Sequence, residues 1–255
     1  MSLMTFVIVC PMVFLAGLVD AIGGGGGLIS LPAYLIAGVP AHNAVATNKL
    51  SSATGTVVST IRYYKNGYAD IRLAIPGIIA ALIGSQLGAR LALLVDAKLF
   101  SGLLIVLLPC IAVYMIFKKD LQPKNADAIS RRKQYIIVTI ASLLLGGYDG
   151  FYGPGTGTFL ILVYTGLAKM DVLTAGGNTK LVNLTSNISS LMVFLLGGAV
   201  YIPLGLAAGV FSILGHYIGA GLAMKNGSKF VRIVILCVIA LLFVKIAMDF
   251  IPKIA

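Results

Sequence analysis

Long apolar runs recur along the whole chain, and short polar stretches separate them. Runs of about 18 or more apolar residues are typical of transmembrane helices. The pattern predicts five segments in each half, at 4–22, 28–38, 43–64, 73–95 and 98–117, then at 134–151, 157–168, 172–196, 203–224 and 229–250. The second segment of each half is too short to cross an ordinary bilayer untilted. We therefore expect an all-α polytopic membrane protein with about eight full spans and two short segments.

The composition supports this fold class and excludes others. The chain is 59% hydrophobic and 11% charged, whereas a soluble domain is about 25% charged. No Lys or Arg precedes the first apolar run, so we expect no cleaved signal peptide. The three cysteines lack the spacing of a zinc site or a disulfide framework. No HExxH, GxSxG or Walker motif occurs, so we expect neither an enzyme nor a bound cofactor or metal.

The chain contains an internal repeat. The stretch "GLVDAIGGGGGL" (17–28) corresponds to "GGYDGFYGPGTGTF" (146–159), which pairs Asp20 with Asp149 at an offset of 129. The stretch "TNKLSSATGTVVS" corresponds to "NTKLVNLTSNISS" at an offset of 131, which pairs Lys49 with Lys180. A nearly constant offset over this length indicates a duplication. We predict an N-terminal transmembrane repeat at 1–117, a basic linker at 118–133 and a C-terminal repeat at 134–255.

The distribution of positive charge predicts the orientation. If every segment crosses the membrane, one side carries 13 Lys and Arg residues in its loops and the other carries two. If the short segments re-enter instead, Lys225, Lys229 and Arg232 lie on the outside. The positive-inside rule favours the first arrangement, in which the repeats are inverted, the linker is cytoplasmic and both termini are outside. The same rule accounts for the net charge of +11 without nucleic acid as a partner.

Four charged residues lie within the apolar segments as repeat-related pairs, namely Asp20 with Asp149 and Lys49 with Lys180. An ionisable residue inside the bilayer is costly and usually has a partner and a function. One interpretation is that each aspartate is a structural counter-ion for a lysine and holds the two halves together. The other is that the aspartates carry protons.

Polar side chains accompany these charges. Thr179, Asn183, Ser186 and Ser190 share one face of a predicted helix, and their repeat mates are also small or polar. Such a stripe can simply support helix packing. However, an oxyanion offers only hydrogen-bond acceptors, and carboxamides beside lysines supply donors. The candidate donors are Asn48, Asn178, Thr179, Asn183 and Asn187.

Two further features have competing interpretations. The "GxxxGA" motifs at 84–89 and 215–220 are most simply sites of close helix packing. His216 follows Gly215 in mid-membrane, where it is either a hydrogen-bonded buried histidine or a proton-coupling group, because histidine titrates near neutral pH.

The stretches "GLVDAIGGGGGLISLP", "ATNKLSSATG", "GGYDGFYGPGTGTF" and "TKLVNLTSNIS" together resemble the TauE/SafE family of membrane permeases. The resemblance covers essentially the whole chain, and four motifs occur in order. It implies a multi-pass permease of a prokaryotic inner membrane. The implied substrates are sulfite, sulfoacetate or related organosulfonates, with thiosulfate a further candidate. Export is the usual family assignment, and the resemblance is compatible with proton coupling.

These features predict a substrate site at the bilayer midplane between the repeats. The N-termini of two short helices, at Gly25, Gly26 and Gly27 and at Gly155 and Gly157, would face an anion beside Lys49 and Lys180. Rocking of one half against the other would alternate access. An anion uniporter or channel is the main alternative, and a non-transporting scaffold is a third. The sequence does not fix the oligomeric state or the direction of transport.

Overall fold

The computed structural model describes residues 2–95 and 129–250, with side chains described through residue 237. The predicted segment at 98–117 and residues 118–128 of the predicted linker lie outside these described residues. Within them the chain is helical and has no strand, which confirms the all-α prediction. The helices are α1 (Leu3–Gly23), α2 (Gly27–Ile36), α3 (Ala41–Lys65), α4 (Ile71–Leu94), α6 (Arg131–Phe151), α7 (Thr156–Gly166), α8 (Val172–Leu196) and α9 (Ile202–Phe250).

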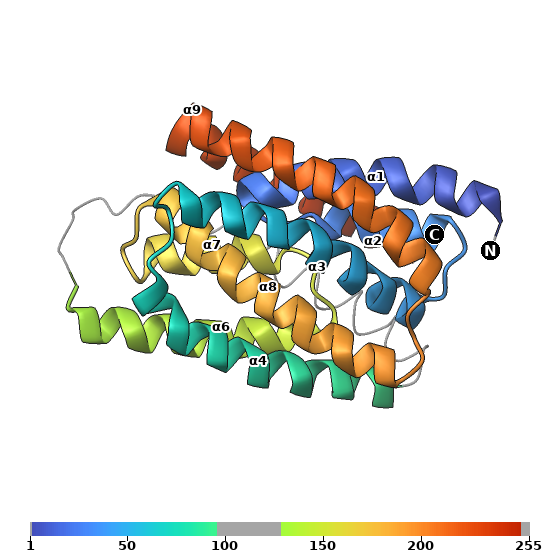
Figure 1. The fold of residues 1–255 in the computed structure, drawn as a ribbon, viewed down its shortest axis with the longest axis horizontal. Helices are drawn as coiled ribbons and strands as arrows, with labels where there is room; N and C mark the ends of the chain where they lie inside the picture. The colour runs from blue at the N-terminus through green and yellow to red at the C-terminus, as the bar shows by residue number, and fades with distance from the viewer. Residues whose placement is uncertain (1, 96–128, 251–255) are drawn as a thin grey trace.

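The long helices run along one axis in three layers, which pair α1 with α9, α3 with α8, and α4 with α6 (Figure 1). The short helices α2 and α7 pack among them. Each boundary lies within a few residues of its predicted segment. The helix α9 combines the last two predicted segments and breaks at Gly227, where φ is 71°.

Four of the described helices are long and apolar enough to span a bilayer, namely α1, α4, α8 and Ile202–Cys237 within α9. The helix α3 is as long as α8 but carries the polar TNKLSSATGT stretch along its buried side. The helix α6 begins with the charged stretch RRKQ. The fold is therefore that of a multi-pass membrane protein, while the total of eight spans stays a prediction.

The helix N-termini are of two kinds. Helices α4, α6 and α8 begin with a side-chain cap, in which Asp70, Ser130 or Asp171 accepts a hydrogen bond from the first turn. Such caps satisfy backbone N–H groups that the helix itself leaves unpaired. Helices α2 and α7 have no side-chain cap, and each follows a glycine. Helix α3 also has no side-chain cap, but it follows the exposed Pro40, whereas the glycines that precede α2 and α7 are buried.

The two predicted halves are interleaved. Helix α4 packs mainly on α6 and α8 of the second half, and α9 packs mainly on α1 and α3 of the first. The GxxxG motifs make these contacts: a Cβ on Gly88 would lie 2.0 Å from the carbonyl oxygen of Gly147, and one on Gly219 would lie 2.3 Å from that of Leu18. Only glycine allows this approach, which confirms the interpretation of both motifs as packing sites.

Two hydrogen bonds recur at the repeat offset of 131 residues. The Asn178 side-chain oxygen accepts the backbone N–H of Asp70 at 2.8 Å, where α4 begins. At the corresponding positions the Thr47 hydroxyl oxygen accepts the N–H of Tyr201 at 3.0 Å, where α9 begins. Each bond joins one predicted half to the other. This correspondence supports the predicted duplication, while the inverted orientation stays a prediction.

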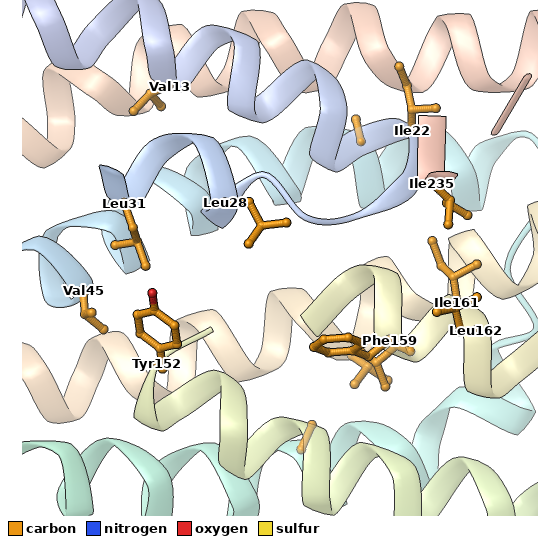
Figure 2. Packing of buried hydrophobic residues seen from close by; sticks show 14 of the residues in the cluster. Val13, Ile22, Leu28, Leu31, Val45, Tyr152, Phe159, Ile161, Leu162 and Ile235 are labelled. Carbon is orange, nitrogen blue, oxygen red and sulfur yellow. The ribbon is translucent and has the colours of Figure 1, made fainter. Parts of the chain in front are cut away.

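The apolar interior fills the space between the short helices and their neighbours. Figure 2 shows Leu28, Leu31 and Val45 facing Tyr152 and Phe159 within one buried cluster. Large apolar side chains also cover the outer face, where a bilayer rather than water suits them. Among these exposed residues are Ile79, Leu87, Leu91, Ile140, Leu144, Leu206, Val210 and Leu214.

Candidate functional site

Glycines with positive φ interrupt the chain at two points in the interior. Between α1 and α2, Gly24 and Gly25 have φ values of 74° and 88°. Between α6 and α7, Gly153 and Gly155 have φ values of 103° and 81°. Residues with a Cβ rarely adopt this region of φ, so these sharp breaks depend on glycine. The breaks turn the chain so that α2 and α7 both begin beside the charged residues of α1 and α6.

The two breaks pack directly against each other. A Cβ on Gly24 would lie 2.2 Å from the backbone nitrogen of Thr158, and one on Gly157 would lie 2.9 Å from the Cα of Gly24. The Thr158 hydroxyl donates a hydrogen bond to the Gly23 carbonyl at 2.9 Å. The motifs GGGGG and GPGTG therefore form one junction between the two predicted halves.

Two ion pairs lie beside this junction, and each joins one predicted half to the other. Lys49 Nζ lies 2.8 Å from Asp149 Oδ2, and Lys180 Nζ lies 3.0 Å from Asp20 Oδ2. Lys180 also donates to the backbone carbonyl of Asp20. The lysine side chains are 2% and 0% exposed, and those of Asp149 and Asp20 are 4% and 14% exposed. An unpaired charge at such depth would be strongly destabilising, so the four side chains depend on one another.

Each carboxylate has additional partners. The Ser186 hydroxyl donates to Asp149 Oδ2 at 2.6 Å. Asp20 Oδ1 accepts the backbone N–H of Gly26 at 3.2 Å, and His216 Nε2 lies 3.2 Å from Asp20 Oδ2. Hydrogen bonds of this kind satisfy the oxygens of an ionised carboxylate. Asp149 is thus supported by a hydroxyl, and Asp20 is supported by the His216 imidazole and by the N-terminus of α2.

A cavity of about 30 Å³ lies between the two ion pairs. It has room for water and is far smaller than the roughly 300–1,000 Å³ of a drug-sized pocket. The structure brings together in its wall most of the residues that the sequence selected. These are Asp20, Gly25, Gly26, Gly27, Asn48, Lys49, Asp149, Gly155, Gly157, Asn183, Asn187 and His216.

The carboxamides of the cavity wall use only part of their hydrogen-bonding capacity within the described residues. Asn187 Nδ2 donates to the backbone carbonyl of Asn183 at 2.8 Å and to its side-chain oxygen at 3.2 Å. Asn48 is 8% exposed, and its Oδ1 has no hydrogen-bond partner within the described part of the chain. A buried polar atom without a partner is rare in proteins. Its position in the wall therefore fits a cavity that holds water or a ligand.

Three selected residues lie outside the cavity wall. Lys180 pairs with Asp20, which lines the cavity, but Lys180 itself is not part of the wall. The Asn178 carboxamide bonds to the start of α4 and contacts Met170 Sδ at 3.9 Å. The hydroxyl oxygen of Thr179 is buried without a partner among the described residues, and the wall does not include it. Asn178 therefore joins α8 to the start of α4, and Thr179 is buried outside the cavity wall.

The cavity wall also contains polar residues that the sequence reasoning did not select as site residues. Among them are Ser30, Ser52, Thr156 and Ser212. Ser52 was visible as the repeat mate of Asn183, and Ser212 lies one helical turn before His216. Thr156 is the first residue of α7, and no periodic signal marks it in the sequence. Its exposure to the cavity depends on the break at Gly155.

A bundle of apolar helices that encloses paired charges, carboxamides and two helix N-termini defines a polytopic membrane protein with an internal polar site. The chain belongs to the sulfite exporter TauE/SafE family, whose profile matches residues 9–246.

The curated relatives carry transporter names. The chain is 36% identical over 236 residues to "Probable membrane transporter protein ORF9" of Sinorhizobium sp, which covers 92% of this chain and 90% of the relative. It is 35% identical over 237 residues to "Probable membrane transporter protein YfcA" of Escherichia coli K12, covering 92% and 87%. A "Probable membrane transporter protein" of Haemophilus influenzae is 33% identical over 236 residues, covering 92% of each. No solved structure matches the chain.

Proposed function

We propose that the protein is a secondary-active transporter of small sulfur-containing anions, such as sulfite or an organosulfonate, and that the cavity is its substrate site. One observation carries this proposal: Lys49, the aspartates of both ion pairs and the N-termini of α2 and α7 line the same cavity. An oxyanion needs donors on several sides, and helix N-termini supply oriented N–H groups. The family's description and the resemblance of the motifs supply the sulfur chemistry.

The ion pairs neutralise the buried lysines when no anion is bound. Asp149 neutralises Lys49 while the cavity is empty, so no unpaired ammonium is buried. An incoming anion competes with Asp149 for Lys49, and Ser186 continues to hold the carboxylate. Binding and release then exchange one anionic partner for another. Because Asp149 can replace the anion at Lys49, the anion is not held permanently in the site.

Alternating access in this proposal involves two interleaved bodies instead of the two halves of the sequence. One body contains α1–α3 and α9, and the other contains α6–α8 and α4, because α9 and α4 pack on the opposite half. Rocking of the predicted halves would break the GxxxG contacts and the buried interfaces around them. Relative motion of the interleaved bodies requires sliding where α8 meets α3, α9 and α1, and where the two glycine breaks meet.

The proposed setting is a prokaryotic inner membrane, with both termini outside and the linker in the cytoplasm. The positive charges of the loops support this orientation. Gradients set the direction of flux for any reversible carrier, and export is the direction that the resemblance implies.

Counterflow of labelled sulfite in reconstituted vesicles tests the function. Wild type should show saturable counterflow, and Lys49→Met/Asp149→Asn should lose it, because both charges leave while the side-chain volumes stay similar. Lys225→Ala removes an exposed lysine and should transport normally. Equal counterflow in wild type and the double variant would remove the Lys49 pair from the mechanism. A high flux that does not saturate would indicate a channel.

A further inference from the structure

The two ion pairs differ in their third partner, and the repeat offset shows where the difference arises. Asp149 accepts a hydrogen bond from Ser186, and the residue that corresponds to Ser186 in the first half is Gly55. Asp20 instead contacts His216, whose corresponding residue is Ser85. The hydroxyl that supports one aspartate is therefore absent at the other, and an imidazole takes its place. The two repeat-related aspartates therefore differ in this partner, although their lysine partners correspond.

The structure builds a slot for this imidazole. A Cβ on Gly55 would lie 2.4 Å from His216 Nδ1, and a Cβ on Gly17 would lie 2.8 Å from the same atom. Two helices of the first half thus leave room for a side chain that α9 supplies. His216 is 2% exposed and forms part of the cavity wall. The ring is therefore shielded from bulk solvent and open to the contents of the cavity.

The slot offers hydrogen bonds to the imidazole in both protonation states. His216 Nε2 lies 3.2 Å from Asp20 Oδ2 and 3.5 Å from the Thr56 hydroxyl. His216 Nδ1 lies 3.0 Å from the Ser212 carbonyl oxygen and 3.3 Å from the Ser212 hydroxyl. A protonated ring donates to Asp20 and to the carbonyl, and a neutral ring donates to Asp20 and accepts from the hydroxyl. The ring can therefore gain and lose a proton without leaving the slot.

The charged groups around the ring cancel one another. Asp20 of α1 and Lys180 of α8 form one pair, and Lys49 of α3 and Asp149 of α6 form the other. Two further titratable groups of α3 bond to neighbouring helices: the Tyr63 hydroxyl donates to the carbonyl of Ala21 on α1, and Arg62 donates to the carbonyl of Tyr217 on α9. The two pairs sum to zero. Of the described side chains in the cavity wall, His216 is the one whose ordinary pKa lies near neutral pH.

We propose that His216 is the proton-coupling residue of the transporter, so that one proton binds at the Asp20 end of the cavity for each monovalent anion that binds beside Lys49. This inference rests on the proposed function. Protonation of His216 changes the summed charge of the ring and the two ion pairs from zero to +1, which favours anion binding in the adjacent cavity. By linkage, a bound anion favours the protonated ring, and release of the anion releases the proton.

The test replaces Gly55 and His216 with the residues found at the repeat-related positions, Ser186 and Ser85. Gly55→Ser/His216→Ser places a serine beside Asp20, as Ser186 lies beside Asp149, and gives position 216 the residue found at Ser85. The purified protein is titrated calorimetrically at about pH 7.5 with the monovalent anions methanesulfonate and ethanesulfonate, in two buffers of different ionisation enthalpy. Neither anion takes up a proton itself at this pH. Wild type should take up about one proton per anion, and the rebuilt variant about none.

Two more variants complete the test. His216→Gln keeps a donor towards Asp20 and should also bind the anion without proton uptake, which guards against misfolding of the rebuilt variant. His42→Gln changes the other histidine of the chain, which lies outside the cavity wall, and should retain the uptake of wild type.

The outcomes separate the two proposals. If neither anion binds wild type, the proposed function fails. If wild type binds an anion without taking up a proton, the function stands and the coupling role of His216 is overturned. Proton uptake that persists in both His216→Gln and the rebuilt variant would also overturn it, because another group would carry the proton.

Discussion

Lys49 and Asp149 form a 2.8 Å ion pair across the boundary between the two predicted halves, with both side chains almost fully enclosed. Lys180 and Asp20 form the corresponding pair in the opposite sense. Neither half can therefore bury its own charges without the other. The duplicated motifs are energetically coupled, and the cavity lies at the point of coupling.

The first prediction concerns stability. Lys49→Ala leaves the Asp149 carboxylate buried without its counter-ion, so we expect a loss of about 3–5 kcal/mol in the free energy of unfolding. Lys49→Met/Asp149→Asn removes both charges and should lose less than Lys49→Ala alone. Reversible unfolding in mixed micelles, compared with exposed Lys225→Ala, measures both effects. A double variant less stable than Lys49→Ala would contradict the coupling of the two charges.

The glycine junction gives a second prediction, with a matched control. Gly24 has a φ of 74°, and a Cβ there would lie 2.2 Å from the Thr158 nitrogen. Gly38 has a φ of 81°, and nothing lies within 4 Å of its Cβ position. Gly38→Ala should lower the free energy of unfolding by about 1–2 kcal/mol, because only the positive φ disfavours alanine there. Gly24→Ala should cost at least about 3 kcal/mol, because steric overlap adds to it. Equal melting temperatures of the two variants would show that the two breaks do not pack as described.

The third prediction concerns acid stability at the polar end of the bundle. Partial burial acts to raise the pKa of Asp70, but hydrogen bonds from Arg131 and the Leu73 amide lower it below the usual value. Asp70 therefore stabilises the fold above its unfolded pKa of about 3.9, and this contribution disappears as the pH falls through the lower folded pKa. Because the Arg131 side chain is 62% exposed, the contribution should be about 1 kcal/mol or less.

Asp70→Asn keeps a cap at the start of α4 and removes this titration. Its melting temperature should fall less steeply than that of wild type as the pH drops below about 4. Arg131→Gln should flatten the curve in the same way, since it removes the partner that lowers the pKa of Asp70. Identical pH profiles for wild type and both variants would remove the pair from acid stability.

The fourth prediction tests the interleaved bodies. Asp70 and Arg131 begin α4 and α6, which come from different halves and belong to one proposed body, and their side chains lie 2.7 Å apart. In a protein with its native cysteines replaced by alanine, a short bifunctional thiol reagent can join Asp70→Cys to Arg131→Cys. Counterflow should continue at the rate of the unlinked variant. Loss of counterflow on cross-linking would show that the two halves of the sequence move against each other instead.

Much of the fold follows from local sequence signals. Hydrophobic runs and glycine breaks place the described helices to within a few residues, because each helix must satisfy its own backbone in an apolar solvent. The packing partners of α4 and α9 do not follow from them. A GxxxG motif shows that a helix approaches another closely, but it does not show which one. The exchange of these two helices between the halves therefore required the structure.

The site could be predicted in its charges and less well in its details. Asp20 and Lys49 stand out because charges inside apolar segments are costly. The sequence does not show why glycine is needed at each of positions 23–27, and the structure gives a different close contact for different positions. A Cβ on Gly26 would lie 2.5 Å from the Ala16 carbonyl oxygen, and one on Gly27 would lie 3.1 Å from the Cα of Pro154. These contacts are made with a neighbouring helix or with the other glycine break, so the periodicity of the sequence does not reveal them.

The most direct test of the central claim is ligand-dependent stabilisation of the purified protein. Sulfite, thiosulfate, organosulfonates, sulfate and carboxylates are added in turn, and the melting temperature is measured at constant ionic strength. A sulfur-containing anion at 100 times its dissociation constant should stabilise wild type by about 2.7 kcal/mol, and Lys49→Met/Asp149→Asn should not respond. A wild-type protein that responds to none of the sulfur-containing anions, or a double variant that responds equally, would contradict an anion site at the cavity.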